Sequence, residues 1–444
     1  MPRDEAHDPV TRDTIAAVAT PPGRGGIGIV RLSGPATPRI AAQLLGTLPA
    51  PRQATNARFV GPGGEPIDDG IALSFPAPHS YTGEDVLELH GHGGPVVMQM
   101  LLAACVDYGA RLAEPGEFTR RAFLEGKLDL AQAEAVADLI DASSREAARS
   151  ALRSLSGEFS TAVSAVRNQL VELRALTEAQ LDFPEEELDV MHREDAARRL
   201  ARIDAALQDI LARSRQGSLL RTGVHVVLAG PPNVGKSSLL NRLAGEERAI
   251  VTDIPGTTRD ALREPIQIEG VPLVMVDTAG LRTSKDEVER LGMARTKQEL
   301  ERADVVLAIH AAIEPQALAI ETPKDATRLD IYNKADLAPG FVAPPGGIAV
   351  SAKTGAGLAE LRQAVLRAAG WSATGESLFL ARERHLRALT AAADHLRRAA
   401  LEGDRWELFA EELRLAQEEL SRITGAFTAE DLLGEIFGRF CIGK

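Results

Sequence analysis

The stretch GPPNVGKS at residues 230–237 decides the fold, because it joins an apolar run, HVVLA at 225–229, to a segment that begins SLL at 238–240. This is the GxxxxGKS pattern of a phosphate-binding loop between a strand and a helix. Its backbone N–H groups can surround phosphate oxygens, while Lys236 reaches the β- and γ-phosphates and the Ser237 hydroxyl binds Mg²⁺. The stretch therefore predicts a P-loop nucleotide-binding domain.

Four further segments follow in the order that a GTPase requires. TDIPGTTRD at 252–260 is rich in turn residues and suited to close over the metal, and DTAG at 277–280 follows an apolar run. NKAD at 333–336 ends in a carboxylate that can accept hydrogen bonds from the guanine ring N–H and amino group, and SAK at 351–353 completes the base pocket. Together they predict GTP specificity.

The residues expected to bind GTP come from these five segments. They are Asn233, Val234, Gly235, Lys236, Ser237, Ser238, Thr252, Asp253, Ile254, Pro255, Gly256, Thr257, Thr258, Asp277, Thr278, Ala279, Gly280, Asn333, Lys334, Ala335, Asp336, Ser351, Ala352 and Lys353. Ser237 and Thr258 are the expected Mg²⁺ ligands among them. The position after Gly280 is Leu281, which cannot orient a water molecule as glutamine does in Ras-like proteins. Another group must do so, and the nearby acids DEVE at 286–289 are candidates, although acids at such positions usually face solvent.

Short apolar runs separated by helical patterns surround the P-loop. Near-continuous apolar strands are typical of a parallel sheet that helices bury on both faces. We therefore expect a Ras-like α/β domain with a mostly parallel sheet. Its strands are expected at 225–229, 273–276, 305–309, 329–332 and 348–350.

The flanking regions differ from this domain. Residues 127–216 repeat apolar residues at steps of three and four, with Gly157 and Pro184 as helix breakers, and the chain is again rich in helix-forming residues after Trp371. The first 126 residues are rich in Gly and Pro and carry short β-type runs, which indicates an α+β domain. The predicted organisation is an α+β domain and an α-helical bundle that the GTPase domain interrupts. Its boundaries are 1–126, 127–218, 219–376 and 377–444.

Composition limits the classes of function. The net charge of −13 argues against a protein that coats nucleic acid, so an RNA site would have to be local or shared with a partner. Two cysteines, Cys105 and Cys441, do not suggest a disulfide framework. Residues 1–13 are polar and acidic, without the pattern of a secretion or transit signal, and no apolar run is long enough to span a membrane. We expect a cytoplasmic protein without a membrane partner.

Motifs outside the GTPase segments resemble those of the MnmE (TrmE) family of tRNA-modifying GTPases. They appear in the family's order along nearly the whole chain, and as a set they are more specific than any GTPase motif. They are ATPPGRGGIG at 19–28, SYTGED at 80–85, GHGGP at 91–95, RLAEPGEFT at 111–119, KLDLAQAE at 127–134 and FCIGK at 440–444.

The resemblance implies more than the residues alone. It implies an N-terminal domain that binds folate and forms a constitutive homodimer, a split helical domain, and an FAD-dependent partner, MnmG (GidA), so that FAD is bound by the partner. Such proteins together install an aminomethyl or carboxymethylaminomethyl group on C5 of uridine 34 of certain tRNAs. The one-carbon unit comes from a 5-formyl or 5,10-methylene tetrahydrofolate derivative.

The family's folate site maps onto Arg31, Glu88, Lys127 and Lys444, whose charges suit a pteridine and a glutamyl tail. Without the resemblance these charges would be taken for surface ion pairs. Cys441 lies in the family's Cys-x-Gly-Lys motif. It is either a small buried apolar residue or a thiol with a part in the modification, and the sequence leaves its role open.

In the GTPase domain the resemblance assigns Asn233, Thr252, Ile254 and Thr257 to a K⁺ ion that bridges the phosphates. This cation would take the place of an arginine finger and stabilise the charge of the transition state. The same mapping makes Glu289 the acid that orients water, so the expected catalytic residues are Glu289, Asn233 and Lys236. Pro255 departs from the family pattern in the potassium loop, where it stiffens the loop without removing a ligand.

Two other functions remain open on sequence grounds. A regulatory, RNA-binding or ribosome-assembly GTPase without modification chemistry would explain residues 224–370 but would leave the N-terminal glycine-rich motifs and the C-terminal motif without a purpose. A folate-dependent one-carbon transferase with a regulatory GTPase domain is the second alternative. Folate binding separates these two, and tRNA wobble modification separates both from the favoured function.

Overall fold

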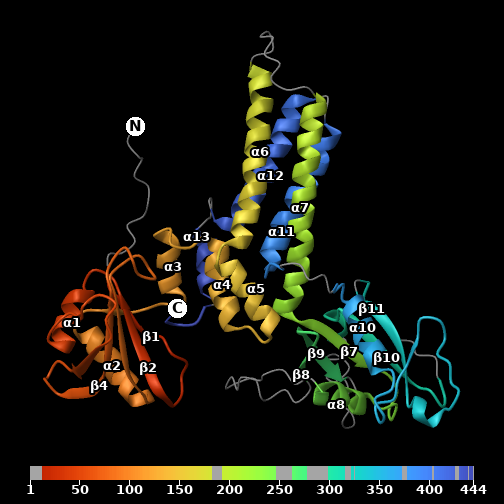
Figure 1. Cartoon of the computed structure of the whole chain (residues 1–444), viewed down its shortest axis with the longest axis horizontal. Helices are drawn as coiled ribbons and strands as arrows, with labels where there is room; N and C mark the ends of the chain where they lie inside the picture. The colour runs from red at the N-terminus through yellow and green to blue at the C-terminus, as the bar shows by residue number, and fades with distance from the viewer. Residues whose placement is uncertain are drawn as a thin grey trace, which may run out of the picture. The chain divides into compact units, whose positions relative to one another are not determined.

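The computed structural model describes residues 13–182, 193–246, 263–277, 299–315, 322–324, 326–372, 378–402, 405–425, 430–438 and 440–443 (Figure 1). The chain forms two compact units. The first unit combines Met1–Ala137 with Thr424–Lys444, and the second unit is Asp138–Ile423. The C-terminal residues thus belong to the same unit as the N-terminal ones.

A six-stranded sheet forms the centre of the first unit. Its strand order is β3-β4-β5-β2-β1-β6, and every neighbouring pair is antiparallel except β1 with β6. The α+β domain predicted from the short β-type runs is therefore present. The strands are β1 Ile15–Val18, β2 Gly25–Ser33, β3 Thr55–Val60, β4 Pro66–Phe75, β5 Val86–Gly93 and β6 Arg111–Leu112.

Helices cover one face of this sheet. Helices α1 (Thr37–Leu45) and α2 (Pro95–Asp107) contribute Ile40 and Leu101 to a buried cluster with Leu32 and Leu89 of the sheet. On the opposite face, α3 (Glu117–Leu124) places Phe118 against Ile15 and Ala17 of β1. The rest of that face, toward β4, carries partly exposed side chains.

The C-terminal helix completes the first unit. Helix α13 (Glu430–Phe437) packs its Phe437 against Leu130 of α4 (Leu130–Ile140). Gly116 is needed where this helix crosses α3, because its φ is +67° and a Cβ there would lie 2.6 Å from the Phe437 carbonyl oxygen. The end of the chain is thereby held against the N-terminal sheet.

Arg121 is the centre of a buried ion network in the first unit. Its side chain is 3% exposed, and its guanidinium donates to Asp13 Oδ1 at 2.7 Å, to Glu117 Oε1 at 2.9 Å and to both Glu84 carboxylate oxygens at 3.1 Å. Burial raises the pKa of the Glu117 carboxyl, but hydrogen bonds from Arg111, the Glu114 N–H and Arg121 outweigh burial, so the pKa lies below its usual value. The pKa of Asp13 is also lowered, because hydrogen bonds from Arg111 and Arg121 exceed the effect of its burial.

Arg121→Leu is expected to lower the free energy of local opening of this unit by about 3–5 kcal/mol at pH 7, because it leaves buried carboxylates unpaired. Since the usual pKa values of Asp13 and Glu117 are 3.8 and 4.5 and the folded values are lower, this stabilisation is present above pH 4.5 and lost as the pH falls through the folded values. The difference between parent and variant should therefore shrink on acidification. Hydrogen exchange of peptides from residues 13–137, followed from pH 7 to pH 3, measures it.

Arg58→Leu is the matched control for this prediction. Arg58 pairs with Asp69 at 3.1 Å, and both side chains are about two-thirds exposed. Such a pair contributes at most about 1 kcal/mol. Equal losses in the two variants would mean that the Arg121 network does not stabilise the unit.

The second unit contains the predicted helical bundle in two segments of the chain. The predicted helical period is borne out in α6 (Glu158–Asp182), where Phe159, Val163, Val166 and Leu170 are all buried, whereas Leu152 before it is exposed. Gly157 separates α5 from α6 in a left-handed conformation, as a helix breaker should. The bundle helices are α5 Arg145–Leu155, α6 Glu158–Asp182, α7 Arg193–Thr222, α11 Glu383–Leu401 and α12 Trp406–Thr424.

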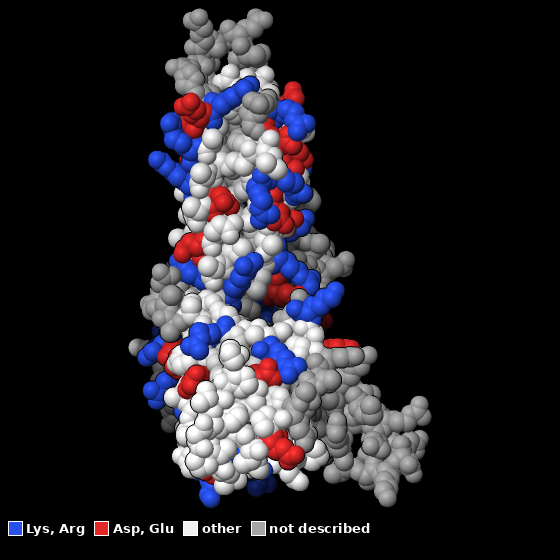
Figure 2. All heavy atoms as spheres, turned by 90° about the vertical axis from the view of Figure 1, so that its right-hand side faces the viewer, with Lys and Arg blue, Asp and Glu red and all other residues white. Residues whose placement is uncertain are grey.

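The outer surfaces of these helices carry charges of both signs. Arg199 pairs with Asp195 on α7 and Arg414 with Glu411 on α12, at the i,i+3 and i,i+4 spacings of helix surfaces. In the view of Figure 2, the described Lys and Arg side chains are interspersed with Asp and Glu. Among the described helices, none is both sufficiently long and sufficiently hydrophobic to cross a membrane.

The second sheet lies between the two halves of the bundle in sequence. Its order is β12-β11-β10-β7-β9-β8, and all neighbours are parallel except β8 with β9. Helices α8 (Lys236–Glu246) and α10 (Leu358–Ala368) follow strands β7 and β12 along the chain. The strands are β7 Val224–Ala229, β8 Arg263–Ile268, β9 Val271–Asp277, β10 Val305–Ala311, β11 Thr327–Asn333 and β12 Ile348–Ala349.

Strand β7 shows why the apolar runs are continuous. Val226 and Leu228 belong to one buried cluster, whereas Val227 and Ala229 belong to another. Successive side chains of a strand point to opposite faces, so both faces of this sheet are buried. The predicted mostly parallel sheet, buried on both faces, is confirmed.

The chain leaves the bundle after α7 and returns to it after α10, and hydrogen bonds join these two connecting segments. Gln216, near the end of α7, donates to the Gly370 carbonyl at 2.5 Å and accepts from the Ser372 N–H at 3.0 Å. A Cβ on Gly217 would lie 1.8 Å from the Phe379 carbonyl oxygen, so the returning chain passes directly against α7. The insertion of the sheet domain into the bundle follows from these contacts.

Candidate functional site

The P-loop follows strand β7, which lies between β10 and β9 in the sheet. Asn233 has φ +63° and Gly235 has φ +91°, so the loop turns sharply before α8 begins at Lys236. A Cβ on Gly235 would lie 2.4 Å from the side-chain nitrogen of Asn333, which excludes any other residue there. The loop and the first turn of α8 present backbone N–H groups and a helix N-terminus, which together favour phosphate.

Lys236 is held inside the loop. Its ammonium donates to the carbonyl oxygens of Gly230 at 2.8 Å and Pro231 at 2.7 Å, and the side chain is buried. These bonds place a positive charge over the loop at the position that the sequence predicted. Ser237 and Ser238 continue into the first turn of α8.

Asn333 joins the base-reading segment to the P-loop. Its side chain is 1% exposed, and its amide nitrogen donates to the Val234 carbonyl at 2.9 Å and the Gly235 carbonyl at 3.4 Å. Its amide oxygen accepts from the Ala352 N–H at 3.1 Å. Because a buried amide is costly unless it is hydrogen-bonded, this residue fixes three segments of the site relative to one another.

The segments predicted to read guanine contact one another. Asp336 Oδ1 accepts a hydrogen bond from the Ser351 hydroxyl at 2.7 Å, and that hydroxyl accepts from the Thr354 N–H at 3.1 Å. The Lys334 ammonium donates to the Asn233 carbonyl at 2.6 Å. The three predicted segments around Asn233, Asp336 and Ser351 therefore form one site.

Part of the predicted site lies outside the described residues. Asp277 is the last residue of β9, and its backbone pairs with Leu228 of β7. The side chain of Asp277 lies outside the description. The remaining predicted residues outside the description are Thr252, Asp253, Ile254, Pro255, Gly256, Thr257, Thr258, Thr278, Ala279, Gly280, Glu289 and Lys444.

No sequence motif indicated that a histidine lies beside the P-loop. His310, at the end of the apolar strand β10, is buried, and its Nε2 lies 2.9 Å from Asp330 Oδ1. Burial raises the pKa of Asp330, but hydrogen bonds from Arg328 and His310 hold it below its usual value. A cavity of about 150 Å³ separates His310 from the P-loop; its lining includes Pro231, Pro232, Asn233, Val234 and Glu314.

In the first unit the structure brings Arg31 and Glu88 together. They are cross-strand partners on β2 and β5, and their side chains pair with N–O distances of 2.9 and 2.7 Å. His90 Nε2 lies 3.2 Å from the other Glu88 oxygen. The Arg31 guanidinium lies 5.6 Å from the ring centre of Tyr81 and 5.8 Å from that of Phe118. Two aromatic rings therefore adjoin the ion pair.

Lys127 is the other expected folate residue that the structure describes. A Cβ on Gly83 would lie 3.2 Å from Lys127 Cε, which places Lys127 beside the turn that follows Tyr81. The chain end returns to β1, since a Cβ on Gly443 would lie 2.4 Å from the Val18 carbonyl oxygen. Cys441 is exposed rather than buried, so the interpretation as a small core residue is wrong.

Comparison with known proteins identifies the family of this chain. A family model described as the MnmE helical domain matches residues 130–441, and one described as the N-terminus of GTP-binding protein TrmE matches residues 14–127. A tRNA modification GTPase MnmE of Azoarcus sp. (strain BH72) is 61% identical over 97% of this chain and 98% of its own length. The protein of that name from Thiobacillus denitrificans (strain ATCC 25259 / T1) is 58% identical over 98% of this chain and 99% of its own length. The chain therefore belongs to the MnmE family of tRNA modification GTPases.

Proposed function

We propose that this protein hydrolyses GTP and acts with an FAD-dependent partner, MnmG (GidA), to modify C5 of the wobble uridine of certain tRNAs. The group installed is aminomethyl or carboxymethylaminomethyl, and a 5-formyl or 5,10-methylene tetrahydrofolate derivative supplies the one-carbon unit. The observation that carries the GTPase part is the buried Asn333 amide, which binds the P-loop and the Ala352 N–H at once. Family membership carries the tRNA part.

Two cations are proposed for the nucleotide site. The donor types fit them, because hydroxyl, amide and carbonyl oxygens suit Mg²⁺ and K⁺. The side-chain amide of Asn233 makes no hydrogen bond to the described residues, so its oxygen can serve as a ligand. Ser237 and Thr258 would hold Mg²⁺, while Asn233, Thr252, Ile254 and Thr257 would hold K⁺. The cations supply positive charge to phosphate oxygens, and Lys236 adds the charge of this chain.

The proposed folate site uses Arg31, Glu88, Lys127 and Lys444. Glu88 presents a carboxylate to the amino and N–H groups of a pteridine, and the rings of Tyr81 and Phe118 offer surfaces on which a flat heterocycle packs. Lys127 and Lys444 suit the glutamyl tail. The ion pair of Arg31 with Glu88 supports this proposal because it holds the carboxylate in place.

The proposed assembly is a homodimer formed by the first unit. Helices α1 and α2 leave the other face of the sheet uncovered. Ile71 of β4 is 44% exposed there, and Ile27 of β2 is 67% exposed. Large exposed apolar side chains on one sheet are typical of a surface that another protein covers. A second copy of this unit is the proposed cover.

Arg31→Ala is expected to weaken binding of 5-formyltetrahydrofolate by about 10- to 100-fold, the worth of one hydrogen bond to a charged group. Isothermal calorimetry measures this, with Arg58→Ala on the same sheet as the control. The variant should still hydrolyse GTP, because Arg31 belongs to the other unit. In a strain that lacks the parent gene, mass spectrometry of tRNA nucleosides should show the modified wobble uridine restored by the parent and not by Arg31→Ala.

The same experiment separates the alternatives. A parent protein that binds no folate would contradict the first-unit assignment and favour a regulatory GTPase. Folate binding without any change in wobble uridine would favour a one-carbon transferase with a different acceptor.

A further inference from the structure

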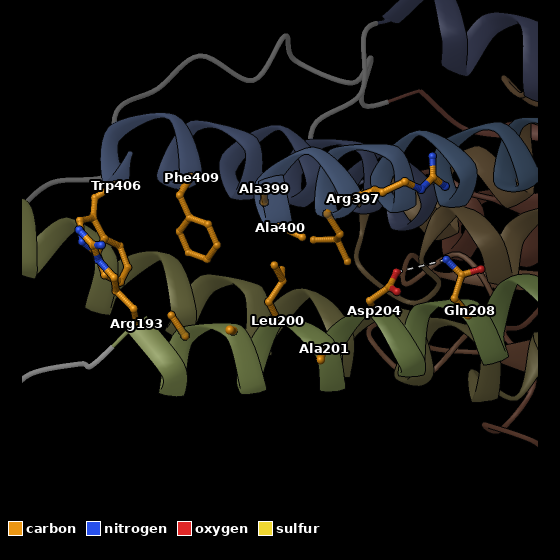
Figure 3. Close-up of a pocket in the computed structure, with 13 residues that line it drawn as sticks. Arg193, Leu200, Ala201, Asp204, Gln208, Arg397, Ala399, Ala400, Trp406 and Phe409 are labelled. Carbon is orange, nitrogen blue, oxygen red and sulfur yellow. Dashed lines mark hydrogen bonds between the residues drawn. The ribbon is translucent and has the colours of Figure 1, made fainter. Parts of the chain in front are cut away.

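Helices α7, α11 and α12 enclose a cavity of about 310 Å³ in the bundle (Figure 3). It lies wholly within the second unit and shares no residue with the nucleotide site. The residues that line it are Arg193, Ala196, Ala197, Leu200, Ala201, Asp204, Gln208, Leu396, Arg397, Ala399, Ala400, Trp406 and Phe409.

Small side chains create this cavity. Ala196, Ala197 and Ala201 of α7 face Ala399 and Ala400 of α11, where larger residues would fill the space between the helices. Ala197, Ala201 and Ala400 are exposed, so solvent reaches the cavity. The cavity is therefore open to solvent between the helices.

The inner wall of the cavity is apolar and aromatic. Leu200, Leu396 and Phe409 are almost fully buried and form its floor. Phe409 and Trp406 meet edge to face, with ring centres 5.7 Å apart, and in Figure 3 both rings point from α12 toward α7. Such a wall favours a flat apolar group, because aromatic rings pack well on one another.

Charged groups lie at the edges of this wall. Arg193 and Arg397 contribute two positive charges, against one negative charge from Asp204. Asp204 already accepts a hydrogen bond from Gln208 at 3.2 Å. Arg397 pairs with Asp394 at 2.9 Å, but both side chains are largely exposed, so this pair is weak and can exchange. The exposed Arg397 guanidinium can therefore turn to an anionic group that binds on the wall, whereas Arg193 takes part in another interaction.

We propose that the cavity binds a small planar aromatic anion, a molecule with a fused-ring or biaryl body and one carboxylate, sulfonate or phosphate group. Its volume falls in the range of small-molecule pockets, roughly 300–1,000 Å³, and is too small for a docked helix. The aromatic body lies on Trp406 and Phe409, and the anionic group pairs with Arg397. This site is independent of the GTPase and folate proposals.

The test uses 1-anilinonaphthalene-8-sulfonate as an aromatic anion and N-phenyl-1-naphthylamine as its neutral counterpart, titrated into the full chain by fluorescence. We expect saturable binding of one sulfonate molecule per chain. Ala201→Phe fills the opening and should weaken that binding by at least about tenfold. Ala165→Phe is the matched control, since Ala165 is an exposed alanine of α6, a helix that contributes no residue to the cavity lining, and it should bind like the parent.

Charge is tested separately. Arg397→Gln should weaken the sulfonate by about tenfold, the low end for one hydrogen bond to a charged group, and leave the neutral probe unchanged. Both sets of variants should hydrolyse GTP at the parental rate, which shows that they fold. Equal binding by Ala201→Phe and Ala165→Phe would overturn the proposal, as would multiple weak binding events. Displacement of the probe by tRNA but by no small aromatic acid would assign the cavity to a nucleotide of RNA and would also overturn it.

Discussion

Asp336→Asn is expected to move the base preference from guanine to xanthine. The carboxylate accepts two hydrogen bonds from guanine, and an amide presents a donor where one of these acceptors stood. Each hydrogen bond to a charged group contributes about 1.5–3 kcal/mol, so GTP affinity should fall by about 10²- to 10⁴-fold. XTP, which carries a carbonyl in place of the amino group, should gain affinity. Titration of fluorescent GDP and XDP analogues measures both changes.

The structure supplies the control for this variant. Ser351 donates to Asp336 Oδ1 at 2.7 Å, while Oδ2 accepts no hydrogen bond from the described residues. Ser351→Ala keeps the carboxylate but releases its orientation, so GTP should weaken by only about tenfold without any gain for XTP. Unchanged GTP affinity in Asp336→Asn would mean that the base pocket lies elsewhere.

Potassium is expected to raise the rate of GTP hydrolysis well above the rate in sodium. Leu281 cannot orient the attacking water and we identify no arginine finger in the sequence, so we propose that a cation held by Asn233 and the acid Glu289 take these roles. K⁺ fits a large cage of carbonyl oxygens better than Na⁺, whose smaller radius leaves those ligands too distant. Glu289→Ala should still bind GTP but hydrolyse it about 10²- to 10³-fold more slowly in a phosphate-release assay.

The backbone of the P-loop decides how the potassium ligand should be tested. Asn233 has φ +63°, a conformation that costs an alanine roughly 1–2 kcal/mol and a glycine almost nothing. Asn233→Gly therefore removes the amide while keeping the loop, and it should lose the stimulation by potassium without losing GTP binding. Equal rates of the parent in sodium and potassium, or full activity of Glu289→Ala, would contradict this mechanism.

Several features of the fold were predictable from local patterns. The strand that precedes GPPNVGKS is β7, and its continuous apolar run matches burial on both faces. The steps of three and four after Gly157 match the buried side of α6. Both predictions succeed because the period of a helix or a strand is a property of neighbouring residues.

The order of the GTPase segments was equally sufficient for the base site. Asn333, Asp336 and Ser351 were each assigned from short motifs that follow strands. Parallel strands bring their carboxyl ends to one edge of a sheet, so the motifs had to converge there. The hydrogen bonds from Asn333 to Val234 and from Ser351 to Asp336 show that these segments lie together.

Sequence alone therefore determined the helical and strand periods of the described bundle and parallel sheet, the P-loop after β7, and the interruption of the bundle by the sheet. Only the tertiary structure decided that α13 packs with α4 in the first unit, that Arg121 binds Asp13 and Glu117, and that alanines of α7 and α11 leave a cavity. These contacts join residues far apart in the chain. An alanine or an arginine has the same local pattern whether it faces solvent, an ion partner or an empty space, so only the packed chain distinguishes these cases.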